Sequence, residues 1–156
     1  MKHKSLLTGL SMLCIMCLFA VPALAEESDA SVQHGAINWH ELMTTDVDAA
    51  LKFYTELFGW ETEKQPMENG TQYVVFKVGG KAVGGVMAIP PQAQGAPPAW
   101  GMYVTVRDVD ASAKQAQELG ATLIMPPTDI PEVGRFCVIQ DPQGAVISII
   151  TYRQHE

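Results

Sequence analysis

The pattern of apolar and polar positions predicts the same order of elements twice along this chain. In the first half, alternation over 37–44 predicts a strand, and apolar residues at helical spacing predict a helix between an N-cap at Asp46 and a stop at Gly59. Three further strands are expected over 60–67, 71–78 and 81–89, separated by the turn dipeptides Asn69-Gly70 and Gly79-Gly80. The predicted order is β-α-β-β-β.

The second half repeats this order after 90–99, a stretch rich in Pro, Gln, Ala and Gly with the composition of a linker. We expect a strand over 101–106, a helix from Asp108 to a stop at Gly120, strands over 121–125, 135–140 and 145–152, a proline-rich loop over 126–134, and a turn over 141–144. The repeat is also literal, because Asp46-Val47-Asp48-Ala49 recurs as Asp108-Val109-Asp110-Ala111. Because the chain contains two copies of one unit, we expect a functional site at the place where the two copies meet.

The first 25 residues carry a different pattern. Lys2 and Lys4 precede an apolar run, and Ala23-Leu24-Ala25 has the form of a signal-peptidase site. We therefore expect a signal peptide (1–25) cleaved between Ala25 and Glu26, a flexible tether (26–34) and one domain (35–153) made of module one (35–89), a linker (90–99) and module two (100–153). This predicts a periplasmic or secreted protein. No stable membrane insertion is expected, because the run is short and no stop-transfer segment follows; an uncleaved anchor is the alternative.

The charge of the chain restricts its expected binding partners, and its cysteine content restricts the expected disulfide bonds. Seventeen acidic residues face ten basic ones, giving a net charge of −7, and two of the lysines belong to the predicted signal peptide. No basic patch remains, so nucleic acid is not expected as a partner. Cys137 is the one cysteine beyond the signal peptide, which excludes an internal disulfide in the mature chain. No basic neighbour would activate it, so we expect an inert, buried thiol.

Two groups of residues point to a family. Thr45-Asp46-Val47 leads to Phe53-Tyr54 and then to Leu57-Phe58-Gly59-Trp60, and Asp141-Pro142-Gln143-Gly144 precedes an apolar last strand. Together they resemble the vicinal oxygen chelate superfamily, which includes glyoxalase I, bleomycin-resistance proteins and extradiol dioxygenases. The resemblance implies an α+β fold in which two tandem βαβββ modules form a curved, cup-shaped mixed sheet with helices on the outside. It also allows a homodimer, because relatives often build each cup from two subunits.

Metal-using members of that superfamily place ligands on the first and last strands of each module. The equivalent positions here hold Trp39, Gly85, Gly101 and Ser148, which do not form a His/Glu site for a divalent ion. A register slip of one residue would bring in only His40 and Met102. We therefore expect no metal site and no cofactor, with a divalent metal as the alternative.

Glu41 is the candidate for chemistry, because it shares a strand face with Trp39. A carboxylate beside an indole in an apolar cup would have a raised pKa and act as a general base; the competing interpretation is a carboxylate at the rim or paired with a cation. Arg135 either holds an anionic group of a ligand or pairs with an acid. The predicted ligand-binding set is Trp39, Glu41, Met87, Tyr103, Ser148 and Arg135.

Other residues are placed around the cup in the same way. His40 is expected to face away from it, Trp100 and Met102 are expected near the cup and the linker, and Gly85 and Gly101 are expected to leave space inside it.

The leading hypothesis is an exported, metal-free protein that binds a small, partly apolar or aromatic molecule in the cup. The alternatives are a lyase, isomerase or dioxygenase with a non-standard metal site that uses His40 and Glu41, and a protein-interaction module.

Overall fold

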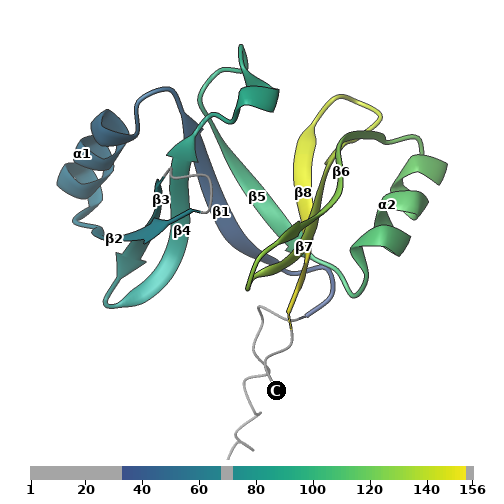
Figure 1. The fold of residues 1–156 in the computed structure, drawn as a ribbon, viewed down its shortest axis with the longest axis horizontal. Helices are drawn as coiled ribbons and strands as arrows, with labels where there is room; N and C mark the ends of the chain where they lie inside the picture. The colour runs from purple at the N-terminus through teal and green to yellow at the C-terminus, as the bar shows by residue number, and fades with distance from the viewer. Residues whose placement is uncertain (1–32, 68–71, 154–156) are drawn as a thin grey trace, which may run out of the picture.

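The computed structural model describes residues 33–67 and 72–153, so the predicted signal peptide, most of the tether and the Asn69-Gly70 turn lie outside the described residues. The described chain forms one eight-stranded mixed sheet with two α-helices (Figure 1). The elements are β1 (Ile37–Thr44), α1 (Val47–Phe58), β2 (Glu61–Pro66), β3 (Gln72–Val78), β4 (Lys81–Ala88), the 3-10 turn η2 (Pro91–Ala93), β5 (Ala99–Thr105), α2 (Val109–Glu118), β6 (Thr122–Ile130), β7 (Gly134–Gln140) and β8 (Val146–Tyr152). The predicted α+β class and the repeated β-α-β-β-β order are confirmed.

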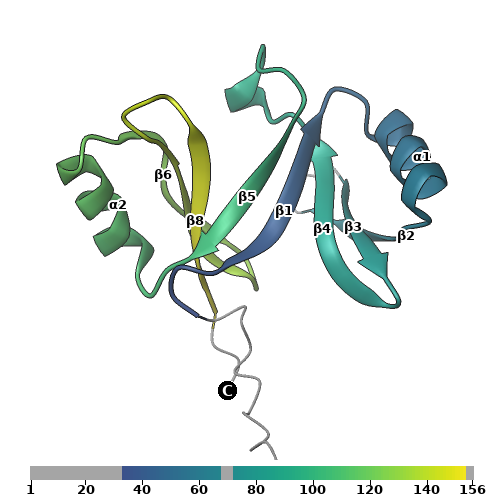
Figure 2. The same cartoon turned by 180° about the vertical axis from the view of Figure 1, so that it is seen from behind.

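The two modules join through their first strands. The strand order is β2-β3-β4-β1-β5-β8-β7-β6, so β1 and β5 lie side by side at the centre and β2 and β6 are the open edges (Figure 2). β1 pairs antiparallel with β5, while each of them pairs in parallel with the last strand of its own module. The helices lie at opposite flanks of the molecule (Figure 1). The place where the two copies meet is therefore the β1–β5 pair.

Both α-helices begin as the sequence predicts. The Oδ1 atoms of Asp46 and Asp108 each accept a hydrogen bond from the backbone N–H three residues ahead, at 2.9 Å in both modules. This satisfies one of the free N–H groups of each first turn. Gly59 closes α1 with φ 68°, a left-handed conformation that glycine adopts without strain. No helix of the described residues is both long and apolar enough to span a membrane.

One face of the sheet carries the helices and two apolar cores. Under α1 the core consists of Leu42, Val74, Phe76 and Val86. Under α2 it consists of Val106, Val109, Ala113, Cys137 and Ile149, so Cys137 is fully buried as expected. Burial raises the pKa of the Cys137 thiol, which opposes formation of a reactive thiolate.

The opposite face of the sheet, here called the helix-free face, is also largely buried. Val75, Tyr103 and Ile150 alternate with the core residues of their strands, yet they are only 5%, 9% and 3% exposed. The rings of Tyr103 on β5 and Phe136 on β7 lie 6.3 Å apart. No helix of residues 33–67 and 72–153 covers these side chains, so their burial is consistent with a curved sheet whose inner side chains lie against one another.

The proline-rich segment after residue 125 differs from the prediction. We expected a loop over 126–134, but β6 continues through Pro126 and Pro127 to Ile130, with register shifts around Met125. A proline cannot donate to a neighbouring strand, but β6 is an edge strand and needs partners on one side only. The edge position of β6 therefore permits two prolines within the strand, which a central strand would not tolerate.

Candidate functional site

A buried carboxylate lies at the centre of the helix-free face. Glu41 on β1 is only 9% exposed, and its neighbours across the sheet are two glycines, Gly85 on β4 and Gly101 on β5. The Tyr103 hydroxyl donates a hydrogen bond to Glu41 Oε1 at 3.0 Å, and the Tyr73 hydroxyl also bonds to this carboxylate. Burial raises the pKa of Glu41, and the bonds from the two tyrosines oppose this increase only in part. Glu41 is therefore a proton acceptor of increased basicity.

The two tyrosines extend the hydrogen bonding to both sides of Glu41. The Trp39 indole Nε1 donates to the Tyr73 hydroxyl at 2.8 Å, and the Ser148 side chain bonds to the Tyr103 hydroxyl. Burial, and then the negative charge of Glu41, raise the pKa of both phenols, so they remain neutral donors at physiological pH. This group of five residues, here called the Glu41 cluster, spans β3, β1, β5 and β8 and thus links the two modules.

No cation neutralises the carboxylate within residues 33–67 and 72–153, where Glu41 forms no ion pair with lysine or arginine. The interpretation of Glu41 as a carboxylate at the rim or paired with a cation does not fit its 9% exposure and its phenol partners. The chemistry resembles the predicted general base in its raised pKa, but the direct partners are phenols, and the Trp39 indole contacts the carboxylate only through Tyr73.

The structure brings four of the six predicted ligand-binding residues into one network, namely Trp39, Glu41, Tyr103 and Ser148. Met87 lies close by on the helix-free face, half-buried, two residues beyond the glycine opposite Glu41 and paired with Met43. Met87 thus offers an apolar, adaptable surface next to the polar cluster.

Arg135 is not part of this site. It lies on the helix side, where its Nε and one terminal nitrogen donate to the two oxygens of Asp110 at 2.7 and 3.0 Å. Its other terminal nitrogen donates to Asp129 at 2.8 Å. The guanidinium lowers the pKa of the Asp110 carboxyl through these hydrogen bonds. Of the two interpretations left open by the sequence, pairing with acids is the one observed.

Tyr73 is the site residue that the sequence did not reveal. A Cβ atom at Gly85 would overlap its hydroxyl and ring, so the space expected at Gly85 is filled by this tyrosine. At Gly101 the nearest atom to such a Cβ is the Glu41 carbonyl oxygen, 3.8 Å away, so space remains there. The signal for Tyr73 in the sequence was Gly85, a residue without a side chain that lies opposite Glu41 on the strand next to the one that carries Tyr73.

Three other residues lie on the helix side of the sheet. His40 is exposed there, as predicted, but Trp100 and Met102 are on that side as well and not in the cup, because they pair across the sheet with Leu42 and His40. His40 and Trp100 help to line an apolar groove of about 290 Å³ beside α1.

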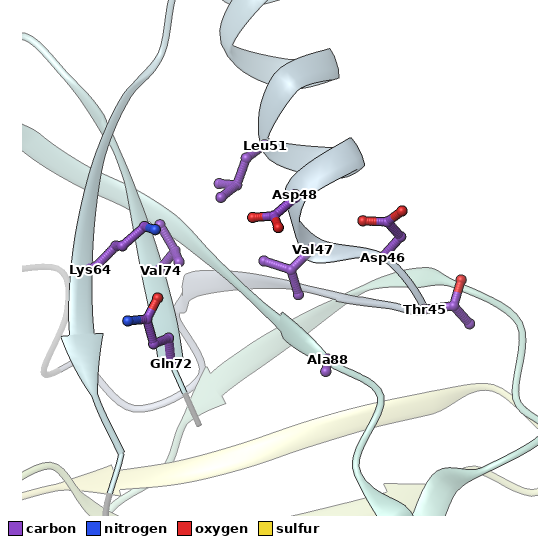
Figure 3. Close-up of a pocket in the computed structure, with 9 residues that line it drawn as sticks. All are labelled: Thr45, Asp46, Val47, Asp48, Leu51, Lys64, Gln72, Val74 and Ala88. Carbon is purple, nitrogen blue, oxygen red and sulfur yellow. The ribbon is translucent and has the colours of Figure 1, made fainter. Parts of the chain in front are cut away.

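A second cavity of about 340 Å³ lies at the first turn of α1 (Figure 3). Its polar lining includes Asp46, the N-cap of α1, and Asp48 in the first turn of α1, together with Lys64 on β2 and Gln72 on β3. Asp46 already caps α1, and the lysine and aspartates have opposite charges. This cavity is explained by the local packing of a helix start against the sheet.

The residues of the Glu41 cluster do not fit the divalent metal that the fold family implies. The four equivalent positions hold an indole, two glycines and a serine, and the donors around Glu41 are neutral phenols and a hydroxyl with no imidazole. Tyr73 also fills the space above Gly85. Throughout residues 33–67 and 72–153, no three His, Cys, Asp or Glu side chains are grouped so as to hold an ion.

Comparison with known proteins now places the chain in a family. The sequence model of the Glyoxalase/Bleomycin resistance protein/Dioxygenase superfamily matches residues 36–149. The chain belongs to this superfamily. The putative glyoxylase CFP32 of Mycobacterium tuberculosis is 39% identical over 125 residues, covering 79% of this chain and 48% of the relative. The anthracycline biosynthesis protein DnrV of Streptomyces peucetius is 33% identical over 127 residues, covering 74% and 46%. This superfamily member thus spans about half the length of these curated relatives.

Solved structures show the same fold. Methylmalonyl-CoA epimerase from Mycobacterium tuberculosis has a TM-score of 0.57 and 18% identity, covering 77% of this chain and 89% of that one. A Streptomyces coelicolor methylmalonyl-CoA epimerase variant in complex with 2-nitronate-propionyl-CoA has a TM-score of 0.57 and 18% sequence identity. The match covers 78% of this chain and 100% of that one. At this identity the likeness concerns the superfamily fold alone.

Proposed function

We propose that this superfamily member is an exported, metal-free protein that binds a small, partly apolar molecule on the helix-free face, with the Glu41 cluster as its polar anchor. The observation that carries the proposal is a buried carboxylate held by neutral hydroxyl donors, with no cation paired to it among the residues that the structure describes. Such a group costs stability that an apolar side chain of similar volume would not cost. Buried ionisable groups of this kind concentrate at functional sites.

The chemistry around Glu41 defines the ligand class. A carboxylate of raised pKa accepts hydrogen bonds, so the ligand presents an alcohol, phenol or amide N–H donor. At Gly101, opposite Glu41, the nearest atom to an added Cβ beyond the chain neighbours is the Glu41 carbonyl oxygen, 3.8 Å away, which supports room for such a group; Met87 and Phe136 lie on the same face. The relatives named for anthracycline biosynthesis, 33% identical, are consistent with a ring compound as ligand.

A thermal-shift screen tests this proposal. The full mature chain is screened with uncharged compounds that combine an apolar ring with an alcohol or amide donor. A true ligand at 100 times its Kd stabilises the folded protein by about 2.7 kcal/mol, which raises Tm by several degrees. The increase is expected to persist in Glu56→Gln, the same change at an exposed position of α1, and to disappear in Glu41→Gln and Tyr103→Phe.

Either of two results would reject the binding proposal: no compound raises Tm, or every compound that raises the Tm of the wild type raises that of Glu41→Gln equally.

Proton transfer is the second candidate, favoured by the raised pKa of Glu41. It predicts that a compound found in the screen is chemically changed by the wild type, while Glu41→Gln still binds it and leaves it intact. Recovery of unchanged compound from the wild type after prolonged incubation would favour binding without chemistry.

Export is tested on the full chain expressed in a bacterial host with its own leader. We expect the protein in the periplasmic or extracellular fraction, with the measured mass of a chain whose first residue is Glu26. Intact chain starting at Met1 in the cytosolic fraction would contradict this part of the proposal.

A further inference from the structure

The helix side of module one contains an apolar groove that the proposed function does not use. His40, Trp60, Val83, Gly84 and Trp100 line it, and these five residues are called the indole groove below; its volume is about 290 Å³. His40 neighbours Trp39 on β1 but points to the other face of the sheet, so the groove and the Glu41 cluster are separated by the sheet itself. Trp100 is 40% exposed and Val83 is 39% exposed, which leaves two walls of the groove accessible.

The groove walls are fixed by contacts within the protein. The Trp60 and Trp100 rings have centroids 6.3 Å apart at an interplanar angle of 89°. Tyr54 stacks on Trp60 at 6.0 Å, and its hydroxyl accepts a hydrogen bond from Trp100 Nε1 at 3.0 Å. The indole orientations therefore do not have to be ordered when a ligand binds, which reduces the entropy cost of binding.

The floor of the groove consists of backbone. Gly84 is buried, and a Cβ atom there would lie 2.8 Å from the His40 carbonyl oxygen and 3.7 Å from the Trp100 ring. Any side chain at position 84 would therefore press against the backbone of β1 and reduce the space below the indole. Glycine keeps this space open.

The lining selects the ligand by its charge and shape. No side chain of the groove carries a fixed charge, so an ionised ligand would lose hydration without gaining a partner. Trp60 and Trp100 lie perpendicular to each other, so a flat ring stacked on the exposed Trp100 indole would also meet Trp60, and His40 is the lining residue with a polar side chain. We propose that the indole groove is a second binding site, for an uncharged planar aromatic molecule of one or two rings with a single hydroxyl group.

NMR titration of the full mature chain with 2-naphthol tests this site. The chain has three tryptophans, Trp39, Trp60 and Trp100, whose indole N–H signals report the two faces of the sheet separately. We expect saturable shifts of the Trp60 and Trp100 signals with a Kd of about 1 mM or lower, whether or not the Trp39 signal, which reports the Glu41 cluster, also shifts. Movement of Trp39 alone would place the naphthol at the Glu41 cluster, which would overturn this inference and leave the proposed function standing.

A pair of matched variants checks the location without touching the core. Val83→Asp adds a charge to an exposed wall of the groove, and Val78→Asp makes the same change at a 51% exposed position of β3 outside it. Naphthol binding is expected to weaken about tenfold or more in Val83→Asp and by less than about twofold in Val78→Asp. Equal affinities in the two variants would overturn the inference. So would a wild-type dimer that Val83→Asp converts to a monomer, because a second copy would then occupy the face.

Discussion

At the residue scale, the defining feature of this protein is a carboxylate that is buried between two glycines. Gly85 and Gly101 flank Glu41 on the neighbouring strands, and the space above Gly85 receives the Tyr73 hydroxyl from one strand further out. Tyr103 completes the arrangement from the other module. Two small residues and two phenols thus provide room and hydrogen bonds where related proteins are expected to hold an ion.

Stability should depend on pH through Glu41. Its pKa is raised in the folded protein and returns to the ordinary value of 4.5 in the unfolded chain. Between these two values the folded state binds more protons than the unfolded state, so the contribution of Glu41 to stability is full below 4.5 and is lost as pH rises through the folded pKa.

Urea unfolding at a series of pH values measures this contribution. We expect the free energy of unfolding of the wild type, minus that of Glu41→Gln, to decrease as pH rises from acid to neutral. Glu56→Gln on the surface of α1 controls for the loss of one negative charge. A wild-type advantage that grows with pH would show that Glu41 is stabilised as an anion, contrary to this account.

The two glycines beside Glu41 should respond differently to alanine. At Gly85 the added methyl group overlaps Tyr73, so we expect a loss of about 1–3 kcal/mol in the free energy of unfolding. At Gly101 the nearest atom is 3.8 Å from the new carbon, so the change should stay below about 1 kcal/mol. Equal losses in denaturant unfolding of the two variants would mean that Tyr73 does not occupy the space above Gly85.

At the element scale, the parts set by local chemistry could be predicted and those set by neighbouring strands could not. Asp46 and Gly59 marked the ends of α1 because capping depends on a few adjacent residues. The extent of β6 was missed because its prolines are tolerated only at a sheet edge, which is a property of the strand order. Tyr73 was missed for the same reason, since its role depends on which strand lies next to Gly85.

The repeat itself held more information than the predicted elements used. Glu41 and Tyr103 are 62 residues apart and bond to each other, and this is the spacing of the two Asp-Val-Asp-Ala segments. Equivalent residues of the two modules therefore meet across the β1–β5 pair, where His40 pairs with its own equivalent Met102. The placement of Trp100 and Met102 on the helix side follows from this register.

The N-caps should contribute to stability to a similar extent in both modules. Asp46→Ala and Asp108→Ala each remove a 2.9 Å bond to a helix N–H, so we expect losses of about 1 kcal/mol each in denaturant unfolding. Asp48→Ala, in the first turn of α1 beyond the cap, should cost less. A cap variant that is no less stable than Asp48→Ala would contradict the capping role.

At the scale of the whole molecule, two repeated modules share one continuous sheet. Each module has its own apolar core under its own helix, but the Glu41 cluster and the β1–β5 pair cross the boundary between them. The open edges β2 and β6 are the strands left without a second neighbour, and the expected homodimer stays a prediction for light scattering.

Sharing the sheet predicts that the modules unfold together. Tryptophan fluorescence reports mainly module one, whereas far-UV circular dichroism reports both, so the two signals should give the same midpoint in urea. Weakening the joint with Tyr103→Phe should lower both midpoints equally, because the hydroxyl bonds across the module boundary. Two separate transitions would show that the modules are independent units.

We expect the Glu41 cluster to perform its role without a metal ion. The most direct measurement is the metal content, by inductively coupled plasma mass spectrometry, of the mature chain purified without chelators or a polyhistidine tag. We predict divalent metal far below one ion per chain, because the residues at the four expected ligand positions are Trp39, Gly85, Gly101 and Ser148. One bound ion per chain, lost in Glu41→Gln, would contradict it.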